Sequence, residues 1–173
     1  MKVFGLSGWS GSGKTTLVVR LIPELLSRGI SVSTVKHAHH DFDIDKPGKD
    51  SYEHRQAGAT EVMISSARRW ALMHEHQGGP EPDLDDIVVN MTPVDLLLVE
   101  GFKRHDHTKL EVHRPANGKP LLCTDDPCIV AVACDVPLPQ VSLPVLDLND
   151  VPGIADFILA ETGLREAVTH GAA

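Results

Sequence analysis

Apolar runs and helical stripes alternate along the chain and predict an α/β fold. A largely apolar run at 2–8 precedes a stretch, 15–29, whose leucine, valine and isoleucine residues share one helical face. Residues 94–102 contain the continuous apolar run of a strand buried on both faces, whereas 109–114 alternate as in a half-exposed strand. Further strands are predicted at 30–37, 61–66, 68–75, 128–135 and 142–148, and further helices at 51–59, 83–91 and 150–163. This order favours a mainly parallel central sheet flanked by helices, with an added antiparallel region at the tight turn after 61–66, in a single domain spanning 1–173.

The segment between the first predicted strand and helix, GWSGSGKTT at 8–16, matches the pattern G-x-x-x-x-G-K-[ST]. Glycine adopts backbone angles that other residues avoid, so successive N–H groups can point into one concavity that suits a di- or triphosphate. Lys14 would reach the β- and γ-phosphates, and the Thr15 hydroxyl would bind Mg²⁺. The helix that begins here adds the positive end of its dipole. We therefore expect a phosphate-binding loop.

A carboxylate at the end of a buried strand commonly supports such a loop, by holding Mg²⁺ or its water. Asp95 and Glu100 flank the apolar run LLLV. In a parallel sheet the ligand lies at the carboxyl edge of the strands, which favours Glu100 over Asp95.

The segment KHAHHDFDID at 36–45 is rich in imidazoles and carboxylates. These residues are His37, His39, His40, Asp41, Asp43 and Asp45. A transition-metal site and a solvated loop without chemistry are both compatible with them. We favour a loop that completes the nucleotide or partner site, in which Asp43 or Asp41 acts through Mg²⁺ or orients a water, and Lys36 or Lys49 meets phosphate. His105 and His107 lie in another loop and are expected at the surface.

Composition excludes several classes of protein. The chain has 173 residues and a net charge of −8, which argues against a general nucleic-acid or anionic-membrane binder. The sequence has no apolar run near the ~20 residues that span a bilayer, and its first strand begins without a signal-peptide core. Its 3 cysteines, without C-x-x-C spacing, favour buried thiols in a reducing cytoplasm.

Four segments together resemble one family: GWSGSGKTTL, VKHAHHDFDIDKPGKDSYEHRQAGA, DLLLVEGFK and KLEVHR. They are similar to MobB, the molybdopterin-guanine dinucleotide biosynthesis protein B family, and the likeness spans about residues 2–165. The resemblance implies a P-loop NTPase fold, GTP binding with weak hydrolysis, and a cytoplasmic homodimer. It also implies an adapter role beside MobA, the nucleotidyltransferase that joins GMP to molybdopterin, with molybdopterin itself a potential ligand. The family's loop residues fall here on Gly11, Ser12, Gly13, Lys14, Thr15 and Thr16, and its strand-end acid on Glu100. Lys14, Glu100 and Asp43 are therefore the candidate catalytic residues, with Thr15 and Glu100 as the metal ligands.

The chain departs from general GTPase patterns in two respects. The guanine-recognition motif N/T-K-x-D is missing: TKLE at 108–111 ends in Glu within a predicted strand, and Asp135 is a weak alternative base contact. No glutamine or arginine has an assignable role in hydrolysis, although Arg68, Arg69 and Arg104 are free candidates, so we expect slow turnover. A P-loop small-molecule kinase and a metal-delivery GTPase that uses the histidine loop remain the alternatives.

Overall fold

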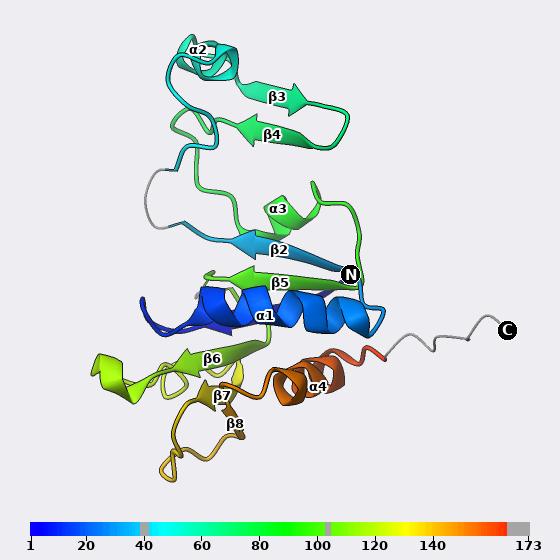
Figure 1. Cartoon of the computed structure of the whole chain (residues 1–173). Coiled ribbons are helices and arrows are strands. Elements are labelled where there is room, and N and C mark those ends of the chain that lie inside the picture. The colour runs from blue at the N-terminus through cyan, green and yellow to red at the C-terminus, as the bar shows by residue number, and fades with distance from the viewer. Residues whose placement is uncertain (39–41, 103–104, 166–173) are drawn as a thin grey trace, which may run out of the picture. The chain divides into compact units, whose positions relative to one another are not determined.

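The computed structural model describes residues 1–38, 42–102 and 105–165, which form two compact units. The first unit contains Met1–His37 and the chain from Met91 onward, and the second contains Ala38–Asn90. Each unit is coloured by position along the chain in Figure 1.

A parallel sheet of 6 strands, in the order β2-β5-β1-β6-β7-β8, forms the centre of the first unit. The strands are β1 (Lys2–Ser7), β2 (Val32–Lys36), β5 (Leu96–Glu100), β6 (Lys109–His113), β7 (Ile129–Cys134) and β8 (Val145–Asp147). Every neighbouring pair is parallel, so the carboxyl ends of all these strands meet at one edge. The predicted mainly parallel sheet is confirmed.

Two helices, α1 (Lys14–Ser27) and α4 (Val151–Thr162), pack against each other beside this sheet (Figure 1). Leu17, Leu21 and Leu25 are spaced at four-residue intervals on α1 and are buried. They share one core with the apolar side chains of α4 and with the β-strand residues Phe4, Leu6, Leu98, Leu110 and Val112. This core fixes the first turn of α1 at the carboxyl edge of β1.

Strand β6 is buried along its whole length, so the predicted half-exposed strand is wrong. Leu110 and Val112 belong to the core, while the polar residues alternate onto the other face. There the Lys109 ammonium lies 3.0 Å from Asp126, and Glu111 accepts hydrogen bonds of 2.9 Å from the N–H groups of Leu122 and Cys123. Alternation separates two faces, but only the tertiary structure shows whether the polar face meets water or a loop.

The second unit carries helix α2 (Asp50–Gln56), the hairpin of β3 (Glu61–Ser65) and β4 (Trp70–His74), and helix α3 (Leu84–Val88). The hairpin is antiparallel, as predicted, and forms a sheet of its own. A capping box between Asp83 and Asp86 begins α3. A short 3₁₀ helix in the first unit, η1 (Pro115–Asn117), was not predicted.

A candidate phosphate-binding loop

The loop between β1 and α1 lies against the end of β6. Gly8 has φ +144°, and a Cβ added there would lie 2.4 Å from the Val112 carbonyl oxygen, so this position requires glycine. Gly13, with φ +101°, is the N-cap of α1 in the left-handed region. At these two positions the loop turns with a backbone conformation that favours glycine over residues with a side chain.

The N-terminus of α1 keeps its first-turn N–H groups available. Gly13 provides no side-chain cap, and the first turn contains no acidic residue. The first backbone hydrogen bond of the helix runs from the N–H of Leu17 to the Gly13 carbonyl. The N–H groups of Thr15 and Thr16 therefore have no partner within the helix, which is the arrangement that binds an anion.

Lys14 folds back over the loop. Its Nζ donates hydrogen bonds to the carbonyl oxygens of Gly8 at 2.9 Å and Trp9 at 3.0 Å. The Ser12 hydroxyl is buried and has no hydrogen-bond partner in the described part of the chain. A cation and an unpartnered buried hydroxyl thus lie within one loop, as expected of a site built for phosphate oxygens.

Thr15 and Glu100 come together at the carboxyl edge of the sheet. The Thr15 hydroxyl lies 3.3 Å from both Glu100 carboxylate oxygens, and Lys36 Nζ lies 3.9 Å from Oε1. Strands β1 and β5 pair with Leu6 opposite Glu100, which places the acid beside the loop. A hydroxyl and a carboxylate are oxygen ligands suited to Mg²⁺, so these residues fit the expected metal.

Asp95 lies at the opposite end of β5 and has a structural role. Its carboxylate accepts hydrogen bonds from the Ser31 hydroxyl at 2.5 Å and from the Ser31 N–H at 2.8 Å, which lower the pKa of Asp95. These bonds fix the beginning of β2 beside β5.

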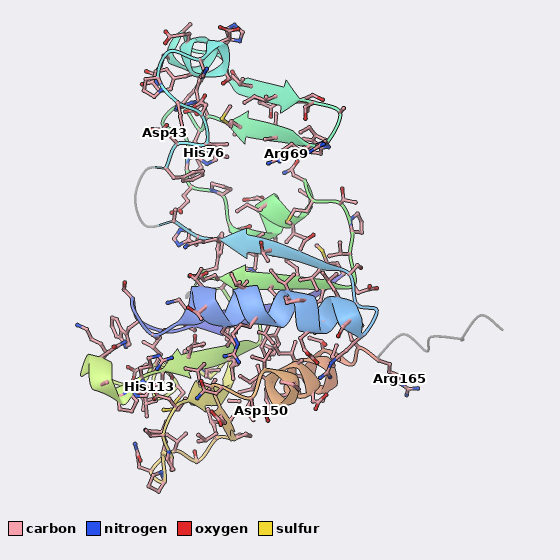
Figure 2. All side chains as sticks on the ribbon, viewed as in Figure 1. Asp43, Arg69, His76, His113, Asp150 and Arg165 are labelled. Atoms are coloured by element: carbon pink, nitrogen blue, oxygen red, sulfur yellow. The ribbon has the colours of Figure 1, made fainter. Side chains whose placement is uncertain are left out.

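Residues after β6 also contact the loop, and the sequence prediction missed them. Arg114 Nε donates to the Ser12 carbonyl at 3.1 Å, and its Nη1 donates to Asp135 at 2.6 Å. Trp9 Nε1 donates to the Pro120 carbonyl at 2.8 Å. His113, the last residue of β6, precedes this group (Figure 2). The sequence feature that could have identified Arg114 is a cationic residue placed directly after a strand of a parallel sheet.

Asp43 lies in the second unit (Figure 2). Its carboxylate pairs with Arg55 Nη2 at 2.6 Å. Asp45 accepts from the same nitrogen at 2.9 Å. These hydrogen bonds raise the pKa of Arg55, with Asp45 contributing most. Arg69 and Arg68 lie at the hairpin turn.

His39, His40, Asp41 and Arg104 fall outside the described residues. Within 1–38, 42–102 and 105–165, no group of three or more histidine, cysteine and acidic residues is arranged to hold a metal ion. In the same residues, no helix is long and apolar enough to cross a membrane.

Two predictions about burial need correction. His107 is 7% exposed and packs on Gly5, so it is not the surface residue that its loop position predicted. Among the cysteines Cys134 is buried, whereas Cys123 and Cys128 are only partly buried. All three are free thiols, and burial raises the pKa of Cys134. Position in a loop does not show whether another segment covers the side chain.

A parallel sheet whose first strand leads through this glycine-rich loop into a helix defines the P-loop class of α/β folds. Within that class, a sequence model of the MobB family, molybdopterin guanine dinucleotide synthesis protein B, matches residues 3–135, and the chain belongs to this family.

Relatives of similar length support the assignment. The chain is 46% identical over 160 residues to the molybdopterin-guanine dinucleotide biosynthesis adapter protein of Escherichia coli K12, covering 91% of each chain. It is 44% identical over 159 residues to the adapter protein of the same name from Haemophilus influenzae, covering 90% of this chain and 86% of the relative. A crystal structure of molybdopterin-guanine biosynthesis protein B superposes with a TM-score of 0.73 at 29% identity, covering 92% of this chain and 99% of the other.

Proposed function

We propose that this protein is a GTP-binding adapter, with weak GTPase activity, that assists the conversion of molybdopterin to molybdopterin guanine dinucleotide. The observation that carries the proposal is the uncapped N-terminus of α1, with Lys14 folded over the loop and Thr15 beside Glu100. Membership of the MobB family supports the pathway, because relatives that match nearly the whole chain bear the adapter name.

Each loop residue has a part in this proposal. The backbone N–H groups of Gly11 and of Gly13 to Thr16, with the buried Ser12 hydroxyl, would donate to the phosphate oxygens, and Lys14 supplies the positive charge. Thr15 and Glu100 hold Mg²⁺, which neutralises charge on the phosphates when bound. We expect slow turnover, since the catalytic arginine and glutamine of fast GTPases have no assigned counterpart here.

Calorimetric titration of the full chain with GTP and with ATP, each with and without Mg²⁺, tests the nucleotide site. Lys14→Ala is expected to lower GTP affinity at least about tenfold, because a charge-assisted phosphate contact is lost. Lys2→Ala, an exposed lysine at the far end of β1, is the matched control. Equal GTP affinity of the Lys14 variant and the wild type would contradict the phosphate site, and a preference for ATP would favour the small-molecule kinase.

The adapter role is tested by capture of a purified MobA-like nucleotidyltransferase on the immobilised protein. We expect capture with GTP and Mg²⁺ present, and we expect the synthesis of molybdopterin guanine dinucleotide by that enzyme to rise when this protein is added. Absence of both effects, with GTP binding intact, would leave a nucleotide-binding protein and refute the adapter.

A further inference from the structure

The guanidinium of Arg114 is held rigidly beside the phosphate-binding loop by two hydrogen bonds. One joins Nε to the Ser12 carbonyl oxygen at 3.1 Å, and the other joins Nη1 to Asp135 Oδ2 at 2.6 Å. Arg114 follows β6 and Asp135 follows β7, which are neighbouring strands. The two strand ends therefore fix the orientation of the cation from one side.

Arg114 retains unused donors in this arrangement. A guanidinium has five N–H donors, and the two hydrogen bonds use two of them. Nη2 makes no hydrogen bond or ion pair with the rest of the described chain. A Cβ added to Gly13 would lie 3.5 Å from Nε and 3.7 Å from Nη2, so the guanidinium borders the N-cap of α1 itself.

The order of strands indicates which part of a nucleotide would reach Arg114. Thr15 and Glu100, the proposed metal ligands, lie at the junction of β1 and β5. A metal ion held by these residues would neutralise charge at the β- and γ-phosphate end of a nucleotide. Strand β6 lies on the other side of β1 from β5, so the nucleoside of a bound nucleotide would extend toward β6 and β7, where Arg114 and Asp135 lie.

We propose that Arg114, held in place by Asp135, is a second nucleotide-binding cation that donates to the ribose oxygens of the ligand. This inference rests on the proposed nucleotide site and adds to it a residue that selects nucleotides over bare polyphosphate. Arg114 keeps 37% of its side chain exposed, which leaves it accessible to a ligand. Asp135 is the positioning residue, and it acts through Arg114.

Titration of Arg114→Gln with two ligands, GTP and inorganic tripolyphosphate, tests the proposal. Tripolyphosphate carries the phosphates but no ribose or base. We expect the variant to lose about tenfold in GTP affinity and to bind tripolyphosphate as the wild type does. Lys14→Ala should lose affinity for both ligands, and Arg20→Gln, which removes an exposed arginine of α1, should lose affinity for neither.

Asp135→Asn gives a second, independent result. It removes the charge that orients Arg114, so we expect weaker GTP binding and unchanged tripolyphosphate binding. The double variant Arg114→Gln/Asp135→Asn should bind GTP no more weakly than Arg114→Gln, because the two residues act as one unit. Thermal unfolding of each variant confirms that the fold is intact.

An equal loss for both ligands in Arg114→Gln would show that the residue only supports the loop through Ser12, and would overturn the proposal. No loss for either ligand would overturn it as well, while leaving the nucleotide site established. If the wild type binds neither GTP nor tripolyphosphate, both the proposed nucleotide site and this inference are refuted.

Discussion

At the scale of single residues, burial of the polar side chains of β6 would destabilise the fold, and their hydrogen-bond and ion-pair partners offset this cost. Lys109 is 1% exposed and Glu111 is 0% exposed, and a charge buried without partners destabilises a fold strongly. Asp126 pairs with Lys109, and two backbone N–H groups donate to Glu111. The segment after β6 is thereby tied to the sheet, close to where Arg114 and Pro120 contact the loop.

His107 makes stability depend on pH. Burial, followed by the nearby charge of Lys109, lowers the pKa of His107 to about 4 from 6.5. Because the unfolded chain binds this proton more readily, stability is lost as the pH falls from 6.5 to about 4. The loss from this residue is at most about 3 kcal/mol.

Urea unfolding of the wild type and of His107→Gln, measured between pH 7 and pH 4 and extrapolated linearly to zero denaturant, checks this expectation. The stability advantage of the wild type over the variant should shrink toward acid pH. His54→Gln, an exposed histidine of α2, should keep the wild-type pH dependence. Parallel curves for the wild type and His107→Gln would show that His107 does not carry the effect.

At the scale of elements, local patterns predicted nearly every helix and strand, because apolar periodicity reflects which face each element buries. The exceptions have physical causes. The burial of β6 depends on the segment 118–128, and η1 is too short to show a period. Lys14, Thr15 and Glu100 were predictable, since a motif and a strand end mark them. Arg114 was not, because the loop it contacts lies 102 positions earlier in the chain.

Helix α4 offers a prediction at this scale. Its N-cap Asp150 accepts a hydrogen bond of 3.0 Å from the N–H of Gly153 (Figure 2). Asp150→Ala should lower the free energy of unfolding by about 1 kcal/mol, because a first-turn donor loses its partner. Asp150→Asn, which keeps an acceptor oxygen, should cost far less, as measured by urea unfolding. An equal loss for both variants would mean that the charge, rather than the cap, stabilises α4.

At the scale of the whole molecule, the net charge of −8 contrasts with the cationic site. Lys14, Lys36 and Arg114 gather around one loop, and each has an acidic or carbonyl partner. A local cluster of cations can bind one polyphosphate while the overall charge disfavours nucleic acid. Binding of a small anion and an acidic isoelectric point are therefore compatible.

One face of the hairpin in the second unit is a candidate contact surface for the expected homodimer. On one face, Val62 and Met73 lie opposite each other and are buried. On the other face, Met63 lies opposite Leu72, and Trp70 follows on the same side with 62% of its surface exposed. Exposed apolar side chains grouped on one face are typical of a protein–protein contact. We propose that this face, Met63, Trp70 and Leu72, forms the contact between two copies.

Light scattering of the full chain tests this proposal. The wild type should have twice the monomer mass of 18.7 kDa, whereas Trp70→Glu/Leu72→Glu should have the monomer mass, because buried like charges would oppose each other across a two-fold contact. Val19→Glu, which alters an exposed apolar residue of α1, should remain dimeric. The double variant should still bind GTP, since the loop, Lys14 and Glu100 belong to the first unit. A dimer that survives the double substitution would place the contact elsewhere, and a monomeric wild type would refute the homodimer itself.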